Sequence, residues 1–212
     1  MMQPARKFAA VAALTVLAGC AASSSSTGQS DAAVRAKALD SMKASFKESG
    51  LVKLDRLDQD ETQALCSQFA DTTLPKDVAA KIEKVNMTAI KPPADGSYLG
   101  DWKRGEQIAQ RGTGFQWSDT ATTPVGANCY ACHQLSKEEI SYGTIGPSLY
   151  HFAKLRGYGP ETQKYAWGRV WNSQAYAACS NMPRFGHKGI LTEQQVKDIV
   201  ALLMDPDSPV NK

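Results

Sequence analysis

The sequence has 212 residues, of which 42% are hydrophobic and 21% are charged, as is ordinary for a soluble globular protein. This length accommodates one ample domain, or one domain with an extension. The formal net charge is +3, and it falls to +1 if the first 19 residues are removed, because Arg6 and Lys7 go with them. Such a small charge gives no reason to expect nucleic acid or an anionic membrane surface as a partner.

Residues 1–19 have the pattern of an export signal. Arg6 and Lys7 form a positive n-region, and a short apolar run follows that is too short to span a membrane. The tetrapeptide L-A-G-C at 17–20 resembles a bacterial lipobox, in which the cysteine is lipidated and becomes the new N-terminus. We therefore expect Cys20 to carry a lipid anchor, the protein's only link to the membrane, and the protein to lie in the periplasm. An ordinary leader, cleaved a little later, is the alternative.

Two segments are expected between the leader and the last domain. Residues 20–30 contain four consecutive serines and predict a flexible tether. Residues 31–95 show helical periodicity and no alternating strand pattern, which predicts a packed helical extension. Its first helix is expected to carry one apolar stripe, made of Leu39, Met42 and Phe46.

The rest of the extension has start and stop signals for two more helices. Asp60 with Gln63 predicts a capping box, and Pro75 is expected to open a third helix with Val78, Ile82 and Val85 on one face. The sequence K-P-P-A-D-G at 91–96 breaks this pattern and predicts the boundary before the last domain.

The last domain, residues 96–212, is predicted to be helical as well. A first helix is expected at 101–111 and contains Gly105, which costs about 1 kcal/mol relative to alanine inside a helix. Close approach of another backbone is the usual compensation, and a purely local tolerance of the glycine is the alternative. Another helix is expected at 161–176, with Trp167 and Trp171 one turn apart.

The final helix has the clearest signals. Thr192 with Gln195 predicts a capping box, and Leu191 with Val196 predicts a hydrophobic staple. The expected buried face consists of Val196, Ile199, Val200 and Leu203.

The sequence C-Y-A-C-H at 129–133 is the attachment signal for c-type haem. The thiols of Cys129 and Cys132 can reach the two vinyl groups of one porphyrin, and the His133 imidazole then falls beneath the iron. A zinc site or a redox dithiol are the alternatives for two cysteines at this spacing. Zinc needs two more ligands that the sequence does not supply in a motif, and a thioredoxin-type dithiol belongs to a βαβ pattern. We therefore expect one covalently attached haem c.

The second axial ligand is expected to be Met182. It lies in an irregular segment that Pro183 stiffens, whereas Met42 and Met204 lie on helical faces and are expected to pack in the core. A histidine and methionine pair raises the reduction potential of haem iron. The alternatives that remain open are His151, His187 and Cys179.

Two cysteines, Cys66 and Cys179, are left over in an exported chain. An oxidising compartment favours a disulfide between them, which the chain-entropy model values at about 4 to 5 kcal/mol. Two buried free thiols are the alternative.

Five stretches together carry a resemblance to a known family. They are C-Y-A-C-H at 129–133, G-T-I-G-P-S-L at 143–149, A-C-S-N-M-P-R-F-G at 178–186, I-L-T-E-Q-Q-V-K-D-I-V at 190–200 and D-S-P-V-N at 207–211. The chain from about residue 101 resembles class I c-type cytochromes, and more narrowly the SoxX family, the monohaem subunits of the sulfur-oxidation cytochrome SoxAX. The resemblance implies an all-α, class I cytochrome c fold with an N-terminal helical extension.

The resemblance also implies roles for site residues. Met182 becomes the distal iron ligand, and the carbonyl of Pro147 orients the His133 imidazole. An aromatic shell is expected around the porphyrin, made of Tyr130, Phe152, Trp167, Trp171 and Phe185. The lipobox departs from the family, whose members are generally soluble, and only some members have a long N-terminal extension.

The function that the resemblance implies is electron transfer within an enzyme. SoxAX joins thiosulfate oxidatively to a cysteine of the carrier protein SoxY, as an L-cysteine S-thiosulfotransferase, and its sulfur site lies on the SoxA partner. The present chain would be the electron-accepting subunit of that heterodimer, with no catalytic residue of its own, and would pass electrons to a small soluble cytochrome c. The competing hypothesis is a stand-alone, membrane-tethered electron shuttle for a respiratory oxidase.

Overall fold

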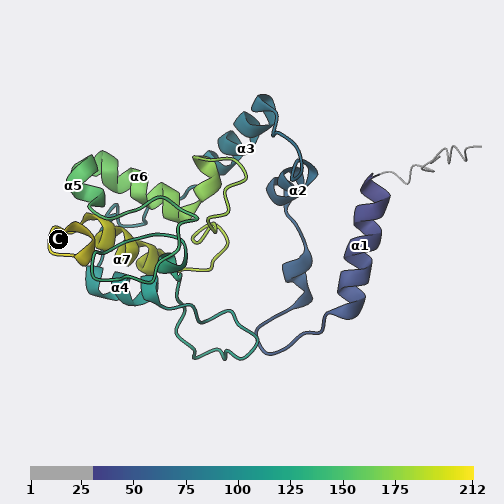
Figure 1. The fold of residues 1–212 in the computed structure, drawn as a ribbon, viewed down its shortest axis with the longest axis horizontal. Coiled ribbons are helices and arrows are strands. Elements are labelled where there is room, and N and C mark those ends of the chain that lie inside the picture. Colours follow the sequence, from purple (N-terminus) through teal and green to yellow (C-terminus); the bar gives the residue numbers. More distant parts are fainter. Residues whose placement is uncertain (1–30) are drawn as a thin grey trace, which may run out of the picture. The chain divides into compact units, whose positions relative to one another are not determined.

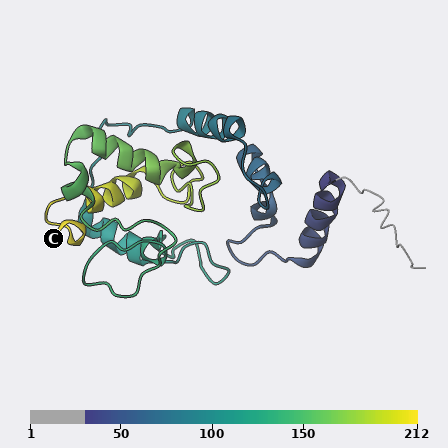
Figure 2. The same ribbon diagram turned by 45° about the horizontal axis from the view of Figure 1, so that its top comes forward.

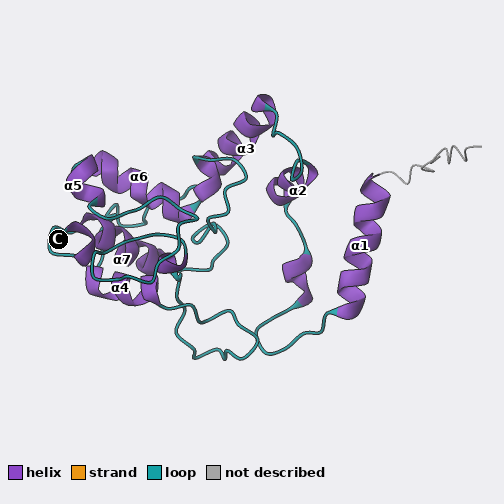
Figure 3. Ribbon diagram, in the orientation of Figure 1, coloured by secondary structure: helices purple, strands orange, loops and turns teal. Residues whose placement is uncertain are grey.

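The computed structural model describes residues 31–212, so the predicted leader, Cys20 and the tether at 20–30 lie outside the described residues. The described residues form helices and loops without a β-strand (Figure 3), apart from one isolated bridge between Ser49 and Val52. The predicted all-α class is therefore confirmed. None of the helices from residue 31 onward is long and apolar enough to span a membrane.

The α-helices and 3-10 helices have the following bounds. The α-helices are α1 (Asp31–Ser45), α2 (Glu61–Gln68), α3 (Lys76–Thr88), α4 (Trp102–Gln110), α5 (Phe152–Arg156), α6 (Pro160–Trp171) and α7 (Glu193–Met204). The 3-10 helices are η1 (Leu54–Leu57), η2 (Cys129–Ala131), η3 (Ser173–Ala175) and η4 (Pro209–Asn211).

The chain divides into two compact units between Ser41 and Met42, a point inside α1. The second unit, 42–212, contains most of the predicted extension together with the last domain. The helix expected at the start of the extension is present, but its apolar stripe is not buried: Met42 is 41% exposed and Phe46 is 58% exposed. The expectation that Met42 packs in a core is therefore wrong. Phe46 lies beyond the end of α1, and the other two residues of the predicted stripe, Leu39 and Met42, offer too little apolar area to be buried firmly.

The two remaining helices of the extension follow the sequence signals closely. The capping box is confirmed, because Asp60 accepts the Gln63 N–H at 2.9 Å and the Gln63 side chain accepts the Asp60 N–H at 3.1 Å. Pro75 precedes α3 as expected. On α3, Ile82 is buried while Val85 is 50% exposed, so only part of the predicted face is covered.

The core of the last domain is built around α7, which packs between α4 and α6 (Figures 1 and 2). Gly105 on α4 lies directly against the backbone of Asp198 on α7, and a Cβ atom at Gly105 would overlap the Asp198 carbonyl. The predicted close approach of another backbone at this glycine is confirmed. The glycine lets α4 and α7 pack backbone to backbone, and this contact fixes the relative position of the two helices.

The final helix is buried more completely than its sequence pattern predicts. The Thr192–Gln195 capping box and the four predicted core residues are present. In addition, Leu202 and even Asp198 are buried, because neighbouring helices cover α7 on two sides. Burial raises the pKa of Asp198, but hydrogen bonds from Arg104, the Asp101 N–H and Gln194 outweigh it, so the pKa lies below its ordinary value.

The helix predicted at 161–176 is interrupted. Its α-helical part, α6, ends at Trp171, and the chain continues into η3 after Asn172, whose backbone is extended. The Asn172 side chain donates to Asn86 Oδ1 at 2.9 Å, so a tertiary contact with α3 replaces the continuing helix. Trp167 and Trp171 remain on α6 and stack with ring centroids 5.2 Å apart.

Candidate haem site

The two haem-attachment cysteines lie on a single tight turn. Asn128 enters it in the left-handed conformation, with φ of 47°, and η2 follows at once. The N–H groups of Cys132 and His133 both donate to the carbonyl of Cys129, at 3.1 and 2.9 Å. Both cysteines are free thiols. This turn thus holds two thiols and an imidazole in one short, hydrogen-bonded segment.

The His133 ring is held from two directions. Its Nδ1 lies 2.7 Å from the carbonyl oxygen of Pro147 and donates to it, which leaves Nε2 as the nitrogen with a lone pair for a metal. The Gly146 N–H donates to Cys132 O at 2.8 Å, and a Cβ atom at Gly146 would overlap the imidazole. The Pro147 carbonyl therefore lies where the resemblance implied it.

Met182 lies in the segment between η3 and α7, partly buried against the main apolar core. Its backbone is fixed by two serines that the sequence reading missed. The Ser173 hydroxyl donates to Met182 O at 2.5 Å, and the Met182 N–H donates to Ser180 Oγ at 3.2 Å. Phe185, three residues further on, belongs to the same core as Tyr130 of the haem-attachment turn.

Two of the three alternative axial ligands are engaged elsewhere. Cys179 forms a disulfide with Cys66, as expected from the unassigned cysteines, so it offers no thiolate. His151 donates its Nε2 proton to the carbonyl of Lys212 at 2.7 Å and stacks on Tyr150.

The third alternative, His187, lines a cavity of about 170 Å³ together with residues of α2 and α3. Partial burial, and then the charges of Arg184 and Lys188, hold its pKa below the ordinary value. The contacts of the structure therefore remove Cys179 and His151 and leave His187 as the alternative to Met182.

The chemistry of the core that contains Tyr130 of the motif fits a mostly apolar group with polar edges. The five aromatic residues of the predicted shell are all buried in the one core cluster. The indole N–H of Trp171 is buried and finds no acceptor among residues 31–212, which fits a group that carries carboxylates, as haem does in its propionates. Burial also raises the pKa of the Cys129 thiol to about 12.

The helical fold, the paired thiols and the oriented imidazole together define a c-type haem protein. Comparison with known proteins agrees with this class. Residues 121–205 match the family model of cytochrome c. An uncharacterized lipoprotein of Aquifex aeolicus (strain VF5) is 40% identical over 161 residues, which cover 73% of each chain. Residues 121–205 therefore form a cytochrome c domain, a kind of domain that binds haem c covalently and transfers electrons. The whole chain belongs to the same family as the Aquifex aeolicus lipoprotein.

Several residues that shape the site carry no motif. Ser173 and Ser180 fix the backbone of Met182, and the Trp171 N–H faces no protein acceptor within the described chain. A serine beside a methionine is too common to be singled out from sequence. Of the contacts between the extension and the Met182 segment, only the Cys66–Cys179 disulfide was expected from the sequence. The other contacts from α2 and α3 were not.

Proposed function

We propose that this protein is the lipid-anchored, electron-accepting subunit of a SoxAX-type thiosulfate-oxidising complex. The observation that carries the proposal is the combination of the oriented His133 with the Met182 segment, in stretches that resemble the SoxX family. The cytochrome c domain at residues 121–205 supports the coarser part, electron transfer. The sulfur-oxidising role rests on the resemblance of the motifs.

Each site residue has a defined task in this function. Cys129 and Cys132 hold the porphyrin through thioethers, and Pro147 fixes the tautomer and direction of His133. Met182 offers a soft thioether, which favours ferrous iron and raises the reduction potential. When bound, the haem supplies a one-electron couple between ferric and ferrous iron. A raised potential suits an electron acceptor.

The chemistry assigned to the complex requires such an acceptor. Formation of a sulfur–sulfur bond between thiosulfate and a carrier-protein thiol releases one proton and two electrons. The haem that Cys129, Cys132 and His133 would hold could accept them one at a time, and the chain would pass each electron to a small soluble cytochrome c. The bond-forming site is assigned to the SoxA partner, and the carrier is SoxY, so the present chain contributes to the enzyme by accepting electrons.

Anchoring to the membrane forms part of the proposal. The lipobox at 17–20 supports lipidation of Cys20, and the relative from Aquifex aeolicus is itself named a lipoprotein. A Cys20→Ser variant should move from the membrane fraction to the soluble periplasmic fraction while keeping its haem. Retention in the membrane of a variant whose leader has been removed would contradict the lipid anchor.

The decisive experiment is purification of the tagged full-length protein from its native membrane extract. We expect a larger c-type cytochrome to co-purify in equal amount, and thiosulfate with the carrier protein to reduce the haem of the pair. A protein that runs as a monomer and is reduced only by a respiratory donor would contradict the heterodimer. It would favour the stand-alone electron shuttle instead.

The axial ligand is tested separately on the purified holoprotein. Replacing Met182 with alanine should abolish the weak methionine-to-ferric-iron charge-transfer absorption and lower the reduction potential. Met204→Leu, in the core of α7, is the matched control and should change neither. Unchanged spectra for Met182→Ala would reject Met182 as the ligand.

A further inference from the structure

We propose that α2 and α3 of the N-terminal extension act as a clamp that holds the Met182 segment in its ligand-presenting conformation. The clamp consists of Asp60, Cys66, Glu83 and Asn86, which are positioning residues for the axial methionine. This inference rests on the proposed role of Met182 and goes beyond it, because it gives the extension a task in setting iron coordination.

The Met182 segment has little structure of its own. Between η3 and α7, residues 176–192, the described chain forms no helix or strand. Cys179 in this stretch adopts the left-handed conformation, with φ of 59°, which is strained for a residue other than glycine. Such a conformation persists only where surrounding contacts impose it. The segment therefore depends on what packs against it.

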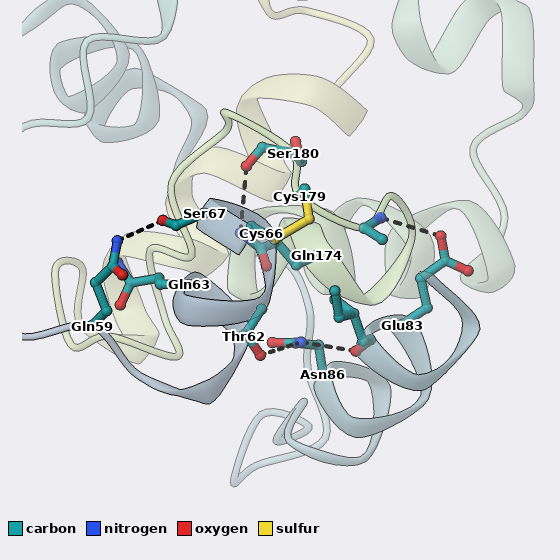
Figure 4. The surroundings of a disulfide bond; sticks show 12 residues. Gln59, Thr62, Gln63, Cys66, Ser67, Glu83, Asn86, Gln174, Cys179 and Ser180 are labelled. Carbon is teal, nitrogen blue, oxygen red and sulfur yellow. Dashed lines mark hydrogen bonds between the residues drawn. A yellow bond between two sulfur atoms is a disulfide. The ribbon is translucent and has the colours of Figure 1, made fainter. Parts of the chain in front are cut away.

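The first support is covalent. The disulfide joins Cys66 of α2 to the strained Cys179, three residues before Met182 (Figure 4). On the same stretch, the Ala178 N–H donates to Glu83 Oε1 of α3 at 3.2 Å. Both α2 and α3 are therefore bonded to the chain just before Met182.

The second support is ionic and lies on the other side of Met182. Asp60 Oδ2 accepts from Arg184 Nη2 and from Lys188 Nζ, each at 2.6 Å. The Arg184 side chain is only 5% exposed, so its charge depends on Asp60 for a partner. The same carboxylate caps α2 through its other oxygen, which makes the ion pair a rigid link between helix and segment.

The third support reaches the start of the segment. Asn86 of α3 accepts from the buried Asn172 side chain and itself donates to Thr62 of α2 at 3.1 Å. Asn172 directly precedes Ser173, whose hydroxyl holds the Met182 carbonyl. The extension therefore contacts the chain before, beside and after the methionine. Contacts at that many points restrict where a thioether can go, and preorganisation of this kind strengthens a weak iron–sulfur bond.

The test uses full-length ferric holoprotein and imidazole as an external ligand that competes with the methionine. Two variants weaken the clamp and leave the disulfide intact. Asp60→Asn keeps the oxygen that caps α2 and removes the negative charge, and Glu83→Ala removes the acceptor for Ala178. The controls are Glu61→Gln, which removes only the exposed ion pair to Lys81, and Glu83→Gln, which keeps an acceptor oxygen.

The measurement is made well below the melting temperature. We expect the equilibrium between methionine and imidazole as the axial ligand to shift toward imidazole. Because an external ligand binds only when the methionine is displaced, imidazole should bind Asp60→Asn about tenfold more tightly than wild type, with a weaker methionine charge-transfer band. Glu83→Ala should shift in the same direction, and Glu61→Gln and Glu83→Gln should match wild type.

The outcomes separate this inference from the proposed function. If wild type shows the methionine band and both clamp variants keep wild-type imidazole affinity and spectra, the clamp is refuted, even if their melting temperatures fall. If wild type lacks the band, the Met182 assignment fails first and the clamp falls with it.

Discussion

At the scale of single residues, a glycine decides how the proximal imidazole is held. Gly146 lies so close to His133 that a side chain there would overlap the ring. The next residue, Pro147, supplies the carbonyl that accepts from Nδ1. Two consecutive residues therefore hold the ring: the Gly146 backbone packs against it, and the Pro147 carbonyl accepts its Nδ1 proton. That arrangement fixes the ring without a further side chain.

Gly146→Ala should therefore disturb the haem site directly. The added methyl group forces the His133 ring or the loop to move, and we expect the free energy of unfolding to fall by about 1–3 kcal/mol, as in other overpacked sites. Urea denaturation and the reduction potential of the holoprotein measure the two effects. Gly159→Ala is the control, because a Cβ atom there would meet nothing within 4 Å. Equal behaviour of the two variants would contradict this account of Gly146.

At the scale of elements, the short helix α2 is tied to the rest of the unit by its first turn. Burial raises the pKa of Asp60, but hydrogen bonds from Lys188, the Gln63 N–H and Arg184 together lower it to about 2. A carboxyl whose pKa is lower in the folded than in the unfolded chain stabilises the fold above its unfolded pKa, near 4. This stability is lost as the pH falls through the folded value.

The pH dependence of Asp60 can be isolated by subtraction. Wild type should be more stable than Asp60→Asn at pH 6, and this difference should shrink as the pH falls from about 4 through about 2, below which the Asp60 carboxyl is neutral in both the folded and the unfolded chain. Urea unfolding of the two proteins in parallel measures it, and the subtraction cancels the titration of groups that do not interact with Asp60. His187 is not among these groups, because burial lowers its pKa and the Asp60 charge partly offsets this. A difference that stays constant from pH 6 to pH 2.5 would mean that the ion pairs to Arg184 and Lys188 do not stabilise the fold.

The helices also show what periodicity can and cannot predict. For α7 the capping box and the four core positions were readable, because both follow from spacing along one helix. The burial of Asp198 was not, since it needs Arg104 on a different helix as its partner. For α1 the periodicity correctly predicted a helix, but the expected burial of Met42 was wrong. Periodicity identifies an apolar face and does not say which element packs against it.

At the scale of the whole molecule, the disulfide closes a loop across 113 positions of sequence. Removing it should lower the free energy of unfolding by about 4 to 5 kcal/mol in the chain-entropy model. Cys66→Ser, Cys179→Ser and the double variant should lose the same amount, because each breaks the same bond. Urea denaturation of the three holoproteins gives the comparison. If the losses of the two single variants add up in the double variant, the cysteines act independently and the bond is refuted.

The sequence by itself determined the chemistry of this protein. Haem attachment by Cys129, Cys132 and His133 follows from local spacing, since neighbouring positions on one turn must reach one porphyrin. The helical class follows from the spacing of apolar residues, which is also a local property of the sequence. The tertiary structure decided how the distant parts of the chain meet. It withdrew Cys179 and His151 as alternatives to Met182, and it brought Asp60 onto Arg184 and Asn86 onto Asn172. Those contacts join residues far apart in the chain, and no local pattern encodes which of many polar side chains will meet.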